Sequence, residues 1–569
     1  MDRTDIKQTA IWQLYEKGRA FHRLNNIYTD TDRNNRFYNG NQWEGAKLGG
    51  VEPVQKNFIK PIVKYKLGVV HDNLYALVFS SQNFDQTMFR QMADKYCKIL
   101  NRYAEKVWEQ DRMDYKFRKI TKDACINDEG VLYIDFDKET MLPVNEVIDK
   151  NDIYYGNENS DDIQSQPYIL IRKRMPVANA RDMAENWGVS EEDMLQIMGD
   201  NDTSEQAGED AKQEVDDQVT VVYKLYRMKG KVYFSVATRY CDMVADVDMG
   251  LKQYPVAHFI WEERKGSSRG EGEVRRLIPN QIEVNRTEMR RILTVQQQAY
   301  PLKVADRKRI KNHEAVNQIG GVVWTEDMTV DDVRKVLGTI PPAQMSPDVV
   351  QLQQDLIQTS RELAGAGDIA TGSVNPEDAS GKAILAVQQA ASAPMTEQRE
   401  GFKAFIEDVA RIWLEYLIIH SAEGVQMEDV ITDPTTGEER VQMVTVPQSA
   451  LEALRAQVRV DVTPKGAYDR FAQERTIENL LLNGFFKPEA LSQLEIYWKV
   501  LPDDAVAPKK MIGEAITYMK EEQKKIAQLQ AQANALQQQM SMAMADMPMP
   551  QMNPMQMPAA MAQSQQMAV

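Results

Sequence analysis

Apolar side chains in the first part of the chain recur every three and four residues, the spacing of helices with one buried face. By this criterion residues 1–125 are mostly helical, beginning with an amphipathic helix in the first 20 residues. In the segment 60–79 the apolar residues keep the same spacing after Pro61, which suits a first helical position. We therefore predict a core helix over 60–79.

From Gly130 the pattern changes to short runs of β-branched and aromatic residues separated by polar turns, which is typical of strands. Four such runs lie between residues 130 and 240: "GVLYIDFD", "QPYILIRKRM", "VTVVYKLYRM" and "KVYFSVATRY". Residues 425–463 look similar, with a turn at 433–438. We expect these later strands to return to the earlier sheet.

Two helical patterns flank a compact insert in the middle of the chain. The first, "RRLIPNQIEVNRTEMRRILTVQQQA", follows a glycine- and serine-rich segment, 265–273, which we interpret as a hinge. Pro279 suits the first turn of this helix, and its thin apolar stripe among arginines predicts packing beside one helix with solvent elsewhere. The second helix is expected over 346–367 with Ser346 as its N-cap. The insert contains a strand candidate at 322–325.

The last third of the chain is again mostly helical by pattern. Its longest helix keeps one apolar face from Phe402 to His420, and we expect Pro394 to kink the segment that precedes it. Helix continues to about residue 540 in an alanine- and glutamine-rich stretch that needs neighbours or copies for stability. The methionine- and proline-rich end is expected to be disordered.

Composition limits the classes of function. The chain has 569 residues, too many for one compact core, and carries 84 acidic against 68 basic side chains for a net charge of −16. This balance argues against a protein that grips phosphate backbones over a large surface, but allows one that lets nucleic acid pass. Three scattered cysteines and five scattered histidines predict neither disulfides nor a metal site, and we expect no cofactor. With no signal peptide or apolar run of membrane length, the protein is expected to stay in the cytoplasm where it is made.

One stretch, "ATGSVNPEDASGKAI", is tempting as a nucleotide-binding loop. The phosphate-binding pattern G-x-x-x-x-G-K-[ST] requires a glycine five residues before Gly381 and a hydroxyl after Lys382. Those positions hold Pro376, which has no N–H to offer a phosphate, and Ala383, which has no hydroxyl for Mg²⁺. The sequence therefore offers no reaction, and we expect a protein that is not an enzyme.

The order of these elements, with the patterns "RFYNGNQW", "IPNQIEVNRTEMRRIL" and "TGSVNPEDASGKAI", resembles the portal (head-to-tail connector) proteins of tailed bacteriophages. The resemblance implies a mostly helical α+β fold that assembles as a ring. Its parts would be a wing (1–265), a first stem helix (266–298), a clip (299–343), a second stem helix (344–367), a tunnel loop (368–380), a long kinked helix with the wing β return (381–470), a helical crown (471–545) and a disordered tail (546–569).

The resemblance also implies a function: a ring, usually of twelve copies, at one capsid vertex of the virion, assembled in the host cytoplasm. Double-stranded DNA would pass through it, and the large terminase, head-tail adaptor or tail proteins, major capsid protein and scaffolding protein would bind it. Candidate channel residues are Arg286, Arg290, Asn375 and Lys382, and candidate docking residues in the clip are Arg307, Lys308, Arg309 and Lys311. The alternatives are another oligomeric capsid or scaffold component, or a packaging ATPase, which the broken phosphate-binding pattern disfavours.

Overall fold

The protein divides into two compact units, Met1–Pro464 and Lys465–Val569. The computed structural model describes residues 7–46, 52–71, 74–79, 87–200, 217–299, 302–305, 308–318, 322–324, 337–340, 345–366, 393–421, 424–432, 439–454 and 458–463, and some residues between 518 and 534. Every described residue of the second unit is helical, in agreement with the helix expected there, and Tyr518, Ile526 and Leu529 are exposed.

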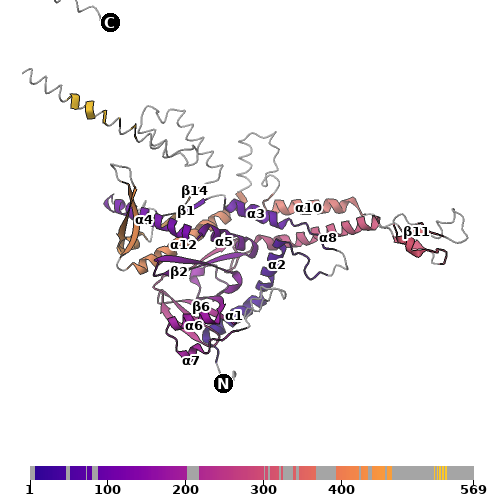
Figure 1. Ribbon diagram of the computed structural model, residues 1–569, viewed down its shortest axis with the longest axis horizontal. Helices are drawn as coiled ribbons and strands as arrows, with labels where there is room; N and C mark the ends of the chain where they lie inside the picture. Colours follow the sequence, from indigo (N-terminus) through magenta and orange to yellow (C-terminus); the bar gives the residue numbers. More distant parts are fainter. Residues whose placement is uncertain are drawn as a thin grey trace, which may run out of the picture. The chain divides into compact units, whose positions relative to one another are not determined.

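Helices dominate the described part of the first unit (Figure 1). They are α1 (Ala10–Leu24), α2 (Ile27–Asn39), α3 (Ile59–Val70), α4 (Thr87–Gln110), α5 (Met113–Asn127), α6 (Val177–Asn186), α7 (Glu191–Met194), α8 (Glu273–Ala299), α10 (Pro347–Leu363), α12 (Thr396–His420) and α13 (Gln448–Leu454). Helices α1, α7 and α10 each begin at a side-chain cap, of which Ser346 was predicted from the sequence. The Thr9 hydroxyl accepts a hydrogen bond from the backbone N–H of Trp12, and the Ser346 hydroxyl accepts one from Asp348.

The strands form several small antiparallel sheets. They are β1 (Leu74–Phe79), β2 (Glu129–Asp137), β3 (Leu142–Ile148), β4 (Ile153–Tyr155), β5 (Tyr168–Pro176), β6 (Gln218–Met228), β7 (Lys231–Ala237), β8 (Asp242–Asp248), β9 (Val256–Ile260), β10 (Leu302–Ala305), β11 (Leu337–Ile340), β12 (Val425–Thr432), β13 (Glu439–Val446) and β14 (Val458–Thr463). A three-stranded sheet has the order β3-β2-β9, and a five-stranded sheet has the order β4-β5-β6-β7-β8. All four strand runs predicted between 130 and 240 are confirmed, as β2, β5, β6 and β7.

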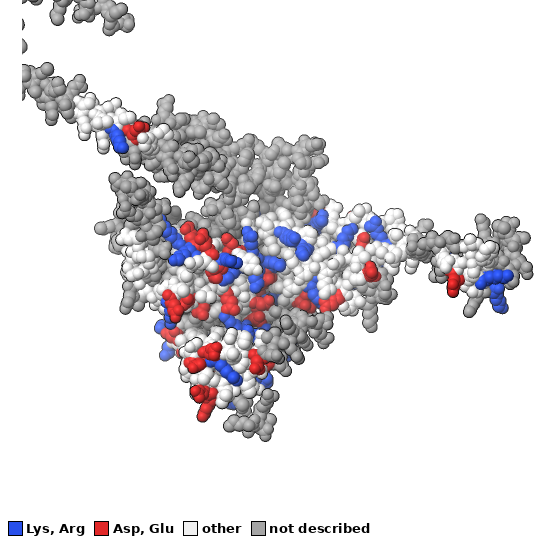
Figure 2. Space-filling view, viewed as in Figure 1, with Lys and Arg blue, Asp and Glu red and all other residues white. Residues whose placement is uncertain are grey.

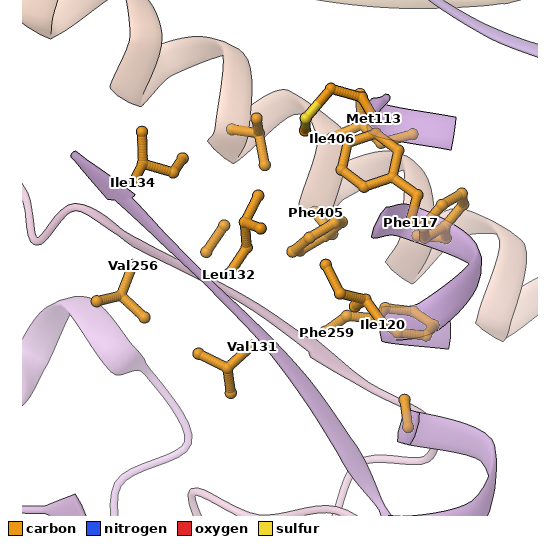
Figure 3. Packing of buried hydrophobic residues seen from close by; sticks show 14 of the residues in the cluster. Met113, Phe117, Ile120, Val131, Leu132, Ile134, Val256, Phe259, Phe405 and Ile406 are labelled. Atoms are coloured by element: carbon orange, nitrogen blue, oxygen red, sulfur yellow. The ribbon is translucent and has the colours of Figure 1, made fainter. Parts of the chain in front are cut away.

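The main core lies where α5 and α12 meet the three-stranded sheet. Figure 3 shows Phe405 of α12 between Leu132 of β2 and Phe117 of α5, with Phe259 of β9 beside them. The rings of Phe117 and Phe405 meet edge to face with centroids 5.5 Å apart. Burying each such side chain contributes about 2–3 kcal/mol. This core therefore holds α5 and α12 against the three-stranded sheet.

Helix α12 is more deeply buried than its sequence pattern suggests. The predicted apolar face is confirmed over the first half of the helix, where Ala404, Asp408 and Arg411 line an exposed face, but every residue from Ile412 to Ile418 is buried. Its polar groups have partners inside the core: Trp413 donates to Asn145 over 2.9 Å, and Tyr416 donates to the Ile134 carbonyl over 3.0 Å. Pro394 lies in a 3-10 turn directly before α12, and the segment that it was expected to kink lies outside the described residues.

Some local predictions are wrong. The helix expected over 60–79 ends at Val70, and Leu74–Phe79 is instead strand β1, which pairs with β14 nearly 400 residues later. The later strands do not return to the earlier sheets, because β12 pairs with β13 and β14 pairs with β1. Periodicity reads only local spacing, so it cannot detect pairing between such distant segments.

Helix α8 and the insert also differ from expectation. The helix begins at Glu273, so Pro279 lies inside it and not in its first turn. Residues 322–324 are not a strand; the strands of the insert are β10 and β11, which pair with each other. Instead, the Asn312 side chain bonds the backbone of Trp324 and Val322 over 2.8 and 2.7 Å, which satisfies those groups without a strand partner.

Candidate functional site

Two of the candidate channel residues, Arg286 and Arg290, lie on an arm of two helices, α8 and α10 (Figure 1). They run antiparallel: Gln353 of α10 donates to Glu288 of α8 over 2.7 Å, and Ser360 further along α10 accepts from Asn280, earlier on α8, over 2.9 Å. Gln353 also donates to the Val284 carbonyl over 3.3 Å. Polar links therefore hold much of this helix pair together, and the predicted packing of α8 beside another helix is confirmed.

The first half of α8 belongs to the protein core. Val274, Leu277, Ile278 and Val284 are buried in the main apolar cluster. In the first turn, Glu273 accepts from the Lys66 ammonium of α3 over 2.6 Å, and both side chains are almost fully buried. The prediction that solvent surrounds most of this helix is thus wrong for its first half.

The second half of α8 is exposed. None of the described side chains from Arg290 to Gln298 is buried, and Val295 is 58% exposed. Arg286 is exposed and pairs with Glu283 one turn away over 2.7 Å. Arg290 is exposed, and its guanidinium makes no ion pair within the part of the chain that the structure describes. These two candidates lie one turn apart on an accessible stretch of helix.

The side-chain amides of Gln281 and Asn285 on α8 hydrogen-bond the backbone of the segment before α3. Gln281 accepts from the backbone N–H of Phe58 over 3.0 Å and donates to the Lys56 carbonyl over 2.9 Å. Asn285 accepts from the backbone N–H of Lys56 over 3.1 Å and donates to the Gln42 side chain. The sequence analysis did not identify this role of Asn285. The signal available was an amide at a buried helical position, which must find partners.

The clip candidates form a small exposed group. Lys308, Arg309 and Lys311 are exposed on either side of the buried Ile310. Lys311 donates its backbone N–H to the Trp324 carbonyl over 3.0 Å, and the Trp324 ring is 66% exposed. Arg307, and the candidates Asn375 and Lys382 of the expected tunnel loop, lie outside the described residues.

The segment interpreted as a hinge, 265–273, is instead anchored by buried charges. Arg269 donates to Glu158 through two nitrogens over 2.9 and 3.0 Å, and it also pairs with Glu129 of β2. Glu129 in turn bonds the His258 ring of β9 over 2.8 Å. We name these four residues, together with His22 of α1, the Arg269 junction. The junction joins the start of α8 to the sheets and to α1.

Two of the three glycines in this segment, Gly270 and Gly272, lie where a side chain would not fit. A Cβ at Gly270 would lie 2.2 Å from Ile260 and 2.6 Å from the Glu262 carbonyl, and one at Gly272 would lie 2.9 Å from the backbone of Asp128. Gly272 donates its N–H to the Asp128 carboxylate over 2.6 Å. The hinge interpretation is wrong because composition alone does not distinguish a flexible glycine from a crowded one.

Neighbouring charges and burial determine which groups of the Arg269 junction are ionised. Burial raises the pKa of Glu129, but Arg269 and the hydrogen bond from His258 outweigh it and set this pKa at about 2. Burial, and then the charges of Arg269 and Lys150, hold the pKa of His22 far below its usual value. His22 is therefore neutral, and its Nε2 accepts from Arg269 over 2.9 Å. The arrangement is a buried ion cluster whose charged groups pair with one another.

Neither a metal-binding cluster nor a membrane-spanning helix occurs among the described residues. In the ranges that the structure describes, no group of three or more histidine, cysteine, aspartate and glutamate side chains could hold a metal ion. Among the same residues, no helix is long and apolar enough to cross a membrane.

Comparison with known proteins identifies one family. The family model described as "Phage P22-like portal protein" matches residues 18–568, nearly the whole chain. No curated protein matches the chain.

Proposed function

The chain belongs to the P22-like family of phage portal proteins, and from this membership we propose that it forms a ring at one capsid vertex, through which double-stranded DNA enters and leaves the head. Twelve copies is the number that the family resemblance implies. The mixture of helices and small sheets is consistent with a portal protein. Portal proteins are structural components of the virion, and we propose that this chain likewise catalyses no reaction and is assembled in the host cytoplasm.

The observation that carries the proposal is the contrast between the two halves of α8. The first half is buried in the core, whereas the second half leaves half-buried and exposed apolar side chains such as Ile292 and Val295 beside α10. Leu352, on the facing helix, is 55% exposed. Helices of this kind are stabilised when neighbouring copies cover them, as happens in a closed ring. We assign α8 and α10 to the stem.

The charge of the chain suits a channel for DNA. A net charge of −16 per copy repels phosphates and keeps the duplex from adhering to the wall. Arg286 and Arg290 would form rings of positive charge that centre the duplex, since every copy repeats each charge. Asn375 and Lys382, in or next to the proposed tunnel loop (368–380), are further candidates for transient contact with DNA.

The proposed docking platform is the clip, 299–343. Its exposed basic residues Lys308, Arg309 and Lys311, with Arg307, would meet the large terminase during packaging and the adaptor or tail proteins afterwards. The wing (1–265), with the β return of 381–470, would face the major capsid and scaffolding proteins, and the crown would comprise 471–545. These assignments rest on the family resemblance.

Site-specific crosslinking during packaging tests the channel. A photoreactive residue at Arg290 or Asn375 is expected to capture packaged DNA, whereas the same residue at Lys138, exposed on the wing, serves as the matched control. Deletion of 299–343 should leave rings intact and abolish terminase binding. Packaging that proceeds with no DNA captured at either channel position would contradict the proposed path.

A further inference from the structure

A group of basic side chains outside the arm is left unexplained by the proposed channel. Lys60 and Lys64 lie on α3, and Arg118, Lys119 and Lys122 lie on α5. Four of them are exposed and Lys60 is half-buried. We name these five residues the α3–α5 patch. In Figure 2, blue side chains, with some red ones beside them, lie over the part of the molecule where Figure 1 labels α3 and α5.

The structure brings these residues together through direct contacts between the two helices. Lys60 and Lys122 both place their ammonium groups over the ring of Tyr38, at 5.6 and 5.3 Å from its centroid. At the end of α3, the His71 ring lies 2.6 Å from the Thr121 hydroxyl of α5. Lys60 and Lys64 are one turn apart on α3, and so are Arg118 and Lys122 on α5. Lys60 and Lys122 therefore meet at Tyr38, with Lys64 and Arg118 one turn away from them, and Lys119 lies near Asp123 as Lys122 does.

The patch has little neutralising charge from the chain itself. Within the described residues, none of its five side chains forms an ion pair, whereas Arg275, Arg276 and Arg286 of α8 all do. Helix α3 contains no acidic residue. Of the two acidic residues of α5, burial raises the pKa of Asp123 to about 6, although this residue lies close enough to Lys119 and Lys122 for their charges to lower that pKa. Asp114 accepts from the Trp108 indole over 3.0 Å. Like charges at this spacing repel, so the surface is favourable mainly when an anion covers it.

The chemistry of the patch favours a phosphate backbone over an acidic protein. Four of its five residues are lysines, which the core of a protein–protein interface tends to exclude. Contacts from lysine and arginine to phosphate oxygens dominate nonspecific binding of DNA. Contacts to phosphate and sugar carry no sequence information, so binding through such contacts is expected to show no sequence preference.

We propose that the α3–α5 patch binds the phosphate backbone of duplex DNA without sequence preference, as a contact separate from the channel residues of α8. The binding does not require a ring, because all five residues belong to one chain. It therefore goes beyond the proposed function and can fail independently of it.

The test is a DNA-binding titration of the full-length protein at several salt concentrations, with a fluorescent duplex as the probe. The patch variant carries Arg118→Gln, Lys119→Gln and Lys122→Gln. The control carries Lys138→Gln, Lys229→Gln and Lys265→Gln, which removes the same charge from exposed positions elsewhere. Circular dichroism of both variants verifies that they fold.

The patch variant is expected to bind DNA more weakly, and the slope of log affinity against log salt should fall by about 2–3. The control should keep the slope of the parent protein. Equal slopes in parent and patch variant, or an equal loss in the control, would overturn the proposal. Polyglutamate that binds the patch when duplex DNA does not would also overturn it, in favour of an acidic protein partner. Native mass spectrometry of the same samples shows whether rings form, so a failure of ring formation can be distinguished from a failure of DNA binding.

Discussion

The two halves of α8 differ in what holds them. The first half, from Glu273 to Met289, lies against the core, is preceded by the Arg269 junction, and begins with the buried Lys66–Glu273 pair. The second half, from Arg290 onward, has no buried side chain among its described residues. One helix thus combines an end that the single chain stabilises with an end that it leaves uncovered.

This difference shows where the chain is complete by itself and where it is not. Buried charges are costly unless each finds a partner, and the Arg269 junction supplies those partners within one chain. Exposed apolar side chains such as Val295 and Leu352 cost little in a monomer but gain stability when a neighbour covers them. Substitutions in the first half should therefore act on folding, and those in the second half on assembly.

The largest effect is expected from Arg269→Met. Removing the guanidinium leaves Glu129 and Glu158 without their buried partner, which should lower the free energy of unfolding by about 3–5 kcal/mol. Urea denaturation measures this loss, with Arg264→Met, at an exposed position in the same loop, as the control. The two variants are compared at equal protein concentration because ring formation also adds stability. Equal midpoints for the two variants would show that the junction does not anchor α8.

A pH effect is expected next, from His71 at the end of α3, the helix that supplies Lys66. Burial lowers the pKa of His71 to about 4, from a usual 6.5, with the charge of Arg118 adding to the effect. The neutral ring is favoured in the folded state, so its contribution is complete above pH 6.5 and is lost as the pH falls through 4. The loss amounts to about 3 kcal/mol.

Burial raises the pKa of Asp123 to about 6, so this group stabilises the folded state as the pH falls over the same range. Denaturation at pH 7 and pH 4 is therefore compared between the parent and His71→Gln, and the variant should lose about 3 kcal/mol less on going to pH 4. Glu129, whose folded pKa is about 2, is already ionised across this range and adds to the loss only below its ordinary pKa of 4.5. An unchanged pH dependence in the variant would place the titrating group elsewhere.

A smaller loss is expected from Gln281→Leu. The change leaves the backbone N–H of Phe58 and the carbonyl of Lys56 without their side-chain partner, at a cost of about 1–3 kcal/mol. Hydrogen exchange at Phe58 should increase in the variant. Gln297→Leu, in the exposed half of the same helix, is the matched control and should leave this exchange unchanged.

The smallest effect on stability is expected from Val295→Asp. The side chain is 58% exposed, so the free energy of unfolding of the monomer should change by no more than about 0.5 kcal/mol. Ring formation should nevertheless decrease, because a charge would enter the proposed contact with the neighbouring copy. Normal rings in this variant would remove the second half of α8 from the interface.

The sequence predicts the elements of this fold better than their connections. The strands β2, β5, β6 and β7 and the cap at Ser346 follow from alternation and from capping chemistry, which are local. The pairing of β1 with β14 depends on segments nearly 400 residues apart, and no local pattern reports it. The exposure of Arg286 and Arg290 could be anticipated from the arginine-rich face of α8.

The anchoring of α8 could not be predicted in the same way. Arg269 and its neighbouring glycines have the composition of a flexible loop, and only the partners Glu129 and Glu158 turn the segment into a buried cluster. These partners come from segments more than 100 residues earlier in the chain. The sequence spacing therefore predicted the two helices α8 and α10, but the composition of the segment before α8 wrongly predicted a flexible hinge.

Counting the subunits of the purified protein tests the central claim most directly. Native mass spectrometry, together with class averages of negatively stained particles, should show closed rings with a mass near twelve times the 65.0 kDa of one chain. Such rings should be weakened by Val295→Asp and not by Lys138→Gln. A parent protein that stays a stable monomer at concentrations where the fold is intact would contradict the account.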